Sequence, residues 1–161
     1  MASPISVAKW FIKNLTDVSV GDVVTHLKVQ KLLYFAQAWH MMTLGRPLFE
    51  EDMQAWPHGP VAPSVWHEFK QYGWQALPVL EGNCDEGLEE DTLSVLEQVK
   101  EIYGPYSAKK LEAMTHAERP WVDARGDRSP EARCEEILPK SSILAYYTEI
   151  YGSSDDGKEA A

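Results

Sequence analysis

The sequence predicts a mainly α-helical fold, with about six helices around one buried central helix and a small two-stranded antiparallel sheet. Three observations lead to this prediction. The run 25–44 is apolar on almost every side of a helix, the flanking segments show helical spacing between Gly and Pro residues, and only two short stretches have strand character. With 161 residues, 44% hydrophobic and 25% charged, the chain has the composition of one compact domain.

The central helix is expected between Thr25, which can cap its first turn, and Gly45, which can end it in a left-handed conformation before Pro47. Its apolar positions extend almost all round: Leu27, Val29, Leu32, Leu33, Tyr34, Phe35, Ala36, Ala38, Trp39, Met41, Met42 and Leu44. Only two narrow polar seams remain, Gln30 with Gln37 and Lys28 with Lys31. Such a helix is predicted to be buried, with the other elements packed around it.

The elements before and after it follow from local signals. A first helix begins at the Ser3-Pro4 cap, and a later one follows Pro63 and ends at Gly73. Between them, 52–56 is predicted to be a strand. Its expected partner is 76–80, where Pro78 is tolerable only on an edge.

The C-terminal half is predicted to contain three more helices. After the acidic loop 81–91, one helix carries Leu93, Leu96, Val99, Ile102 and Tyr103 inward and stops at Gly104. Ser107 caps the next helix, which ends before Pro120, and 125–130 is a polar loop. Ser141 caps the last helix, which extends to Gly152. The expected domain is therefore 1–152, followed by a disordered tail, 153–161.

Charge and cysteine content limit the possible functions. The net charge of -10 and a pI near 4.9 disfavour direct binding to nucleic acid, because the phosphates would meet the wrong sign. Cys84 and Cys134 have neither a metal-ligand spacing nor a disulfide framework. No signal peptide or membrane span is apparent. A cytoplasmic protein without membrane contact is the expectation.

No pattern of catalytic, cofactor or metal residues stands out. The five histidines, at positions 26, 40, 58, 67 and 116, show no metal-binding spacing. Ser64 lacks the setting of a nucleophile elbow, and the glycines form no phosphate-binding loop. A structural role for the histidines is therefore preferred over a hydrolase built on them, and no enzyme activity is predicted.

The turn 56–60, Trp-Pro-His-Gly-Pro, combines a stiff backbone with large aromatic side chains. One interpretation is a structural corner, and the other is a surface presented to a partner, since rigid aromatic residues are frequent anchors at interfaces. The same two interpretations apply to Pro120-Trp121. The candidate partner-binding residues are Trp56, His58, Trp66, Trp74 and Trp121.

Three segments together resemble a known family. They are 25–39 (THLKVQKLLYFAQAW), 45–49 (GRPLF) and 55–66 (AWPHGPVAPSVW), with a comparable Thr-His and Pro-Trp closure at 115–121. In order and spacing they are similar to the Panacea domain of SocA-like antitoxins, which belong to bacterial and phage toxin–antitoxin pairs. The likeness extends over roughly 5–152.

The resemblance implies an antitoxin that neutralises its cognate toxin by direct binding, without catalysis or cofactor. It also implies an adaptor role, in which the antitoxin delivers the toxin to the ClpXP protease. The terminal Ala160-Ala161 is similar to the end of the tag that ClpX recognises, so the tail is either a degradation signal, a protease tether or an ordinary disordered end. The alternative is a transcriptional regulator or DNA-binding antitoxin, whose nearest candidate recognition helix contains Lys28 and Lys31.

Overall fold

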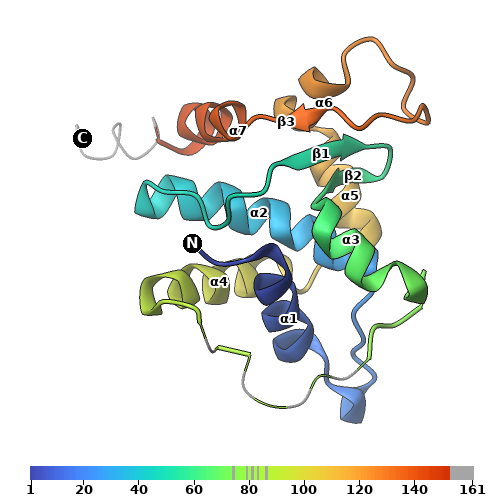
Figure 1. Ribbon diagram of the computed structural model, residues 1–161, viewed down its shortest axis with the longest axis vertical. Helices are drawn as coiled ribbons and strands as arrows, with labels where there is room; N and C mark the ends of the chain where they lie inside the picture. Colours follow the sequence, from blue (N-terminus) through green and yellow to red (C-terminus); the bar gives the residue numbers. More distant parts are fainter. Residues whose placement is uncertain (74, 79, 81, 83, 86, 153–161) are drawn as a thin grey trace.

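The computed structural model describes residues 1–152 except 74, 79, 81, 83 and 86 (Figure 1). The predicted tail, 153–161, and Trp74 lie outside the described residues. In the described part, the fold is mainly α, with seven α-helices and one three-stranded antiparallel sheet. This confirms the fold class.

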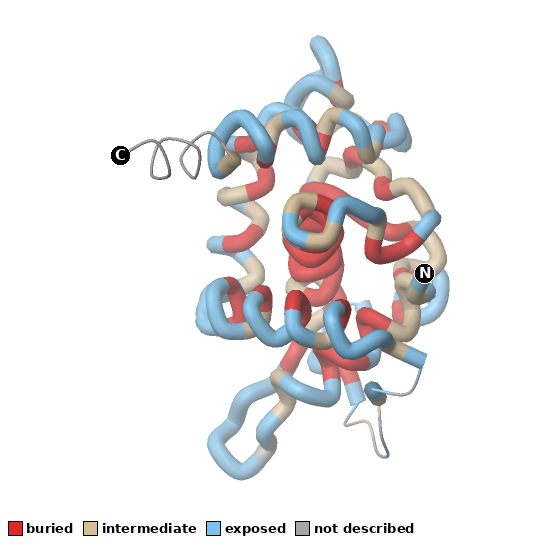
Figure 2. Tube along the Cα trace, turned by 90° about the vertical axis from the view of Figure 1, so that its left-hand side faces the viewer, coloured by how far each residue is buried: buried red, intermediate tan, exposed pale blue. Residues whose placement is uncertain are grey.

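Helix α2, His26–Leu44, lies at the centre of the molecule. The Thr25 hydroxyl accepts a hydrogen bond from the Lys28 amide, and Gly45 ends the helix with φ 72°, as predicted. Figure 2 shows α2 end-on as a column of buried residues inside a ring of elements with exposed outer faces. The burial of α2 is therefore confirmed.

The other helices surround α2 on several sides. In Figure 1, α1 and α4 lie on one side of α2, and the sheet and α7 lie on the other. The helices are α1 Pro4–Leu15, α3 Pro63–Phe69, α4 Glu90–Tyr103, α5 Ala108–His116, α6 Arg119–Arg125 and α7 Lys140–Tyr147. Short 3₁₀ turns, Val18–Val20 and Lys70–Tyr72, extend the connections.

The predicted strand pairing is wrong. Strand β1, Met53–Trp56, lies in the middle of the sheet, between β2, Gly59–Val61, and β3, Ile137–Leu138. The stretch expected as the partner, 76–80, contributes only an isolated bridge from Ala76 to Thr25. Because β1 is followed by a two-residue turn, the nearest partner is the segment directly after that turn.

Helix α6 is the additional helix. Pro120 was expected to end a helix, but it lies in the first turn of α6, where its missing N–H costs no hydrogen bond. The predicted cap at Ser141 is also wrong, because α7 begins at Lys140 after Pro139. The Lys140 ammonium donates to the Glu50 carbonyl (2.5 Å), which ties this helix start to the chain before β1.

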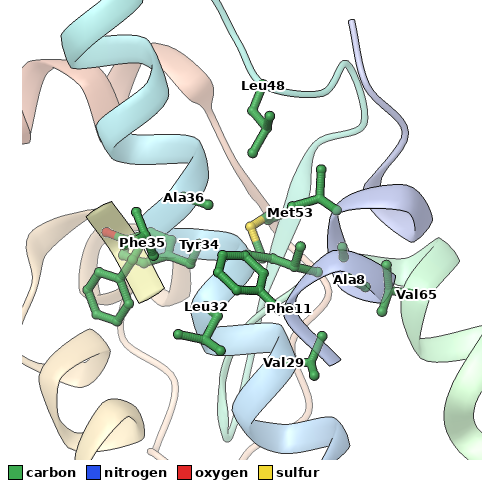
Figure 3. Packing of buried hydrophobic residues seen from close by; sticks show 14 of the residues in the cluster. Ala8, Phe11, Val29, Leu32, Tyr34, Phe35, Ala36, Leu48, Met53 and Val65 are labelled. Carbon is green, nitrogen blue, oxygen red and sulfur yellow. The ribbon is translucent and has the colours of Figure 1, made fainter. Parts of the chain in front are cut away.

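The core is centred on α2. Figure 3 shows Leu32, Tyr34, Phe35 and Ala36 of α2 among side chains that come from α1, α3, β1 and the segment before β1. The neighbours labelled there are Ala8, Phe11, Leu48, Met53 and Val65, all at most 2% exposed. Apolar side chains from distant segments thus pack on one helix.

Two apolar positions differ from expectation. Ile102 of α4 is 54% exposed, because α4 turns Val95, Leu96 and Val99 inward instead. Trp39 is half-buried, and its indole N–H donates to the Tyr103 hydroxyl (2.8 Å).

No helix among the described residues is both long and apolar enough to span a bilayer.

Candidate partner-binding site

The β1–β2 hairpin is closed by a tight, well-supported turn. Trp56 pairs with Gly59, which leaves Pro57 and His58 as the two turn residues. Gly59 has φ 111°, and a Cβ atom there would lie 2.6 Å from Lys31 Cε. The turn therefore needs glycine both for its backbone angle and for its close approach to α2.

Gln30 attaches the strand after this turn to α2. Its side-chain oxygen accepts from the Ala62 amide (2.8 Å), and its amide nitrogen lies 3.4 Å from the Ala62 carbonyl. The same amide nitrogen donates to His26 Nε2 (2.9 Å). A buried side chain of α2 thus satisfies backbone groups at the end of β2, which keeps the hairpin in register on the helix.

Trp56 and Trp66 form a pair of half-buried rings beside the turn. Their centroids are 5.4 Å apart with an interplanar angle of 59°. The Trp56 indole N–H donates to Gln54 Oε1 (2.8 Å), and the Lys70 ammonium lies 5.3 Å from the Trp66 ring centroid. Together with exposed His58, these two rings make up what we call the tryptophan surface.

The tryptophan surface separates two hollows. The first, which we call the lysine pocket, has a volume of about 270 Å³ and is lined by His26, Leu27, Gln30, Lys31, Trp56, Pro57, His58, Val61, Trp66, Lys70 and Gly73. The second, of about 570 Å³, lies against the same tryptophans and the segment 131–135. Both rings are therefore accessible from two sides.

Trp121 supports the turn from beneath. It is 6% exposed, its indole N–H donates to the Trp56 carbonyl (2.8 Å), and its ring stacks on His116 at a centroid distance of 3.9 Å. The Arg125 guanidinium lies 5.0 Å from the Trp121 centroid and donates to the Ala55 carbonyl (3.0 Å). These contacts fix the position of β1 and its turn.

Glu112 of α5 holds the tip of the turn. Its carboxylate accepts from His58 Nδ1 (2.9 Å) and lies 3.5 Å from the Lys109 ammonium. Partial burial raises the pKa of this carboxyl, but the hydrogen bond from His58 and nearby positive charge outweigh that effect and lower the pKa below its ordinary value. The ionised carboxylate is therefore the favoured partner for His58.

Lys31 is a cationic side chain with no solvent exposure. It is 0% exposed, and its ammonium donates to the Pro60 carbonyl at 3.3 Å. Burial lowers the pKa of Lys31 to about 7, although the charge of Glu112 opposes the shift. Burial, together with the charge of Lys31, lowers the pKa of His26 to about 4. His26 is thus a neutral hydrogen-bond acceptor at neutral pH.

The structure brings together Trp56, His58 and Trp66 and places Trp121 beneath them. Sequence reasoning missed Lys31 and Glu112 as parts of this site. For Lys31 a signal was available, since a lysine in an otherwise apolar helix must either reach solvent or find a polar site. For Glu112 no signal was available, because its contact with His58 spans 54 residues of sequence.

Other polar side chains have structural partners. His40 contacts the Arg46 carbonyl (2.8 Å) and the Thr92 hydroxyl (2.9 Å), and the Ser64 hydroxyl donates to Glu51 (2.9 Å). Among the residues that the structure describes, no group of three or more His, Cys, Asp or Glu is placed to hold a metal ion.

Comparison with known proteins identifies the family. The family described as "Antitoxin SocA-like, Panacea domain" matches residues 29–122, which include α2 from Val29 onward, the hairpin, α3, α4, α5 and Trp121. Antitoxin SocA of Caulobacter vibrioides (strain NA1000 / CB15N) is 32% identical over 109 residues, covering 61% of this chain and 58% of the relative. The match thus spans less than two thirds of that relative. No solved structure matches the chain. The chain belongs to the SocA-like antitoxin family, and residues 29–122 carry its Panacea domain.

Proposed function

We propose that this protein neutralises a cognate toxin by binding it directly through the tryptophan surface. Membership of an antitoxin family supports a toxin as the partner. The observation that carries the choice of surface is the half-buried Trp56–Trp66 pair on a backbone held by Gly59 and Glu112. A rigid aromatic pair loses little conformational entropy when a partner covers it.

The half-exposure of the two rings suits this role. A fully buried tryptophan would offer no contact area, whereas Trp56 and Trp66 keep part of each ring accessible beside hollows of about 270 and 570 Å³. A partner can insert side chains into these hollows and cover the rings, which is the geometry that hot spots use. Trp121 contributes indirectly, because it holds the Trp56 carbonyl.

The test begins with copurification from the native host and identification of a stoichiometric partner by mass spectrometry. Calorimetric titration of that purified partner then compares wild type with Trp56→Ala and Trp66→Ala. We expect each substitution to weaken binding by about 2 kcal/mol, roughly 30-fold, while the fold persists in thermal melts. Ile102→Ala, at an exposed site on α4, is the matched control and should bind as wild type. Unchanged affinity in both tryptophan variants would move the interface elsewhere.

Delivery of the bound toxin to the ClpXP protease is the finer part of the proposal. Its support is the likeness to SocA-like antitoxins. Toxin half-life after translation is stopped should be short when this protein and ClpXP are both present, and long when either is missing. Replacing Ala160 and Ala161 by Asp separates a role of the tail from a role of the domain. If the toxin half-life is the same with and without ClpXP, the protein neutralises the toxin by binding alone.

A further inference from the structure

We propose that the lysine pocket is a binding site for a small carboxylate with an aromatic or aliphatic body, either a free metabolite or the C-terminal residue of a polypeptide. The pocket shares Trp56, His58 and Trp66 with the tryptophan surface, but the inference does not rest on toxin neutralisation, because its tests use small probes and no toxin. It is built from α2, the β1–β2 turn and α3 with the turn that follows it.

The charge of the pocket lining is opposite to that of the chain. The chain has 25 acidic and 15 basic residues, yet the described residues that line the pocket include Lys31 and Lys70 and no carboxylate. The nearby Glu112 is outside the lining and is engaged by His58 and Lys109. An anion is therefore the ligand that this local charge favours.

Lys31 gives the pocket a buried basic group with few hydrogen-bond partners. An ammonium has three donors, and within the described part of the chain Lys31 makes one hydrogen bond, to the Pro60 carbonyl at 3.3 Å. Burial disfavours the ammonium form of such a lysine, and a carboxylate in the pocket would stabilise that form. Because Lys31 is 0% exposed, its ammonium would attract a bound carboxylate without direct contact. This attraction is stronger in the buried pocket wall than in water. Exposed Lys70 is the group that can contact the anion directly.

The remaining walls select the body of the ligand. Trp56, Trp66, Pro57, Leu27 and Val61 present aromatic and aliphatic surface. The volume of about 270 Å³ corresponds to roughly nine water-sized units of ~30 Å³ each. A phenyl or short aliphatic group joined to one carboxylate fits these dimensions.

The test uses three probes of one shape and different charge: 3-phenylpropanoate, 3-phenylpropanamide and 3-phenylpropylamine. Titration of the full-length protein at pH 7 by calorimetry, with Trp fluorescence as a second signal, measures each affinity. We expect the acid to bind about tenfold or more tightly than the amide, and the amine not to bind. Equal binding of acid and amide would overturn the proposal.

Two variants test whether Lys31 and Lys70 attract the carboxylate of the acid probe. Lys31→Met and Lys70→Met should each weaken binding of the acid about tenfold and leave the amide unaffected. Lys28→Met, on the same helix but outside the pocket, is the matched control and should bind the acid as wild type does. Lys70 is exposed, so Lys70→Met keeps the test decisive if Lys31→Met disturbs folding. Full acid affinity in folded Lys70→Met and Lys31→Met would refute the assignment.

A second set of probes distinguishes the two sources of the carboxylate. A hexapeptide that ends in Phe is titrated with a free and with an amidated C-terminus. Binding of the free-acid peptide more tightly than 3-phenylpropanoate indicates a polypeptide C-terminus, and the reverse indicates a small metabolite. Binding of neither acid would overturn the site altogether.

Discussion

Lys31 carries an ionisable amine into a part of the molecule that water does not reach. Its side chain is 0% exposed and passes directly beneath Gly59. Burial lowers the pKa of Lys31 from 10.5 to about 7, so the folded protein favours the neutral amine above about pH 7. The unfolded chain favours the ammonium up to a much higher pH. Folding at this position therefore releases a proton between about pH 7 and 10.5.

The first prediction concerns the pH dependence of stability. Between pH 7 and 9 the unfolded state binds more protons at Lys31 than the folded state does, so the free energy of unfolding should rise with pH. The rise attributable to Lys31 is at most about 1.4 kcal/mol per pH unit. Lys31→Met removes the titrating group, so the variant should lack this rise. Urea denaturation of both proteins at several pH values measures the difference.

Lys28→Met provides the control for that experiment. Lys28 lies one turn away on α2 and is half-buried, with its ammonium 2.6 Å from the Gly104 carbonyl. Its removal should cost one half-buried hydrogen bond. Burial also lowers the pKa of Lys28, with the charge of Asp22 opposing the shift, so Lys28→Met should flatten the pH profile less than Lys31→Met does. Parallel pH profiles for wild type and Lys31→Met would show that Lys31 is not desolvated in the folded protein.

At the scale of elements, α2 holds two distant backbone segments through glutamine side chains. Gln37 Oε1 accepts from the Leu48 amide (2.7 Å), and Gln37 Nε2 donates to the Phe49 carbonyl (3.0 Å). Gln30 makes the equivalent pair of contacts with Ala62. The polar seam of the sequence thus faces inward, because each amide supplies both a donor and an acceptor to a segment that has left regular structure.

The second prediction tests this attachment. Gln37→Leu keeps the size of the side chain but leaves a buried N–H and a buried carbonyl without partners. We expect a loss of about 2 to 4 kcal/mol in the free energy of unfolding. Gln98→Leu makes the same change at an exposed site on α4 and should stay within about 0.5 kcal/mol of wild type. Equal midpoints in chemical denaturation would mean that the Leu48–Phe49 segment is held by its apolar side chains alone.

The third prediction concerns the hairpin turn. Gly59→Ala combines a left-handed backbone with a Cβ placed 2.6 Å from Lys31 Cε and 2.9 Å from Thr115 Oγ1. Gly21→Ala provides the control, because Gly21 has φ 78° and no atom within 4 Å of the added Cβ. Gly21→Ala should cost about 1 kcal/mol and Gly59→Ala about 1 to 3 kcal/mol more. Thermal melts of the two variants measure the loss of stability. Similar losses would show that Lys31 and Thr115 move aside to accommodate the added Cβ at position 59.

Local signals predicted the helix ends well and the sheet poorly. Ser3, Thr25 and Ser107 each cap a helix, because capping depends only on residues within one turn. Strand β3 lies more than 80 residues after β1, and two paired residues leave too weak a pattern to detect. Its position is fixed by packing, which local propensity does not contain.

In the candidate site, too, local features were predictable and contacts between distant segments were not. The stiff turn pointed to Trp56, His58 and Trp66, since Pro and Gly restrict the backbone wherever they occur. The role of Arg125 was not predictable. Arg125, expected in a polar loop, is 2% exposed and donates to four backbone carbonyls, at Ala55, Ser129, Pro130 and Ala132. Such contacts depend on which segments meet in space.

At the scale of the whole molecule, net charge bears on the alternative function of DNA binding. The chain carries a charge of -10, and the helix that contained the nearest candidate recognition lysines is α2. In the structure Lys31 is 0% exposed and Lys28 is half-buried against Gly104. Neither ammonium is free to lie along a phosphate backbone.

The fourth prediction follows from that charge distribution. In a salt-titrated mobility-shift assay, duplex DNA from the coding region's own promoter should show no complex at about 0.15 M salt. A weak complex at low salt should disappear steeply as salt rises, as expected for non-specific contact. A complex that survives above about 0.2 M salt and discriminates between sequences would favour a DNA-binding antitoxin instead.

The central position of α2 also has a consequence for synthesis. The nascent chain completes this helix at Leu44, whereas α7, which packs on it, is completed at Tyr147, about 100 residues later. At a synthesis rate of about 5 to 20 residues per second, the mainly apolar helix α2 lacks the packing of α7 for roughly 5 to 20 s. During that interval the helix is a binding segment for chaperones and an opening for proteases. Chaperones and proteases can therefore reach this helix during synthesis, before any partner meets the finished fold.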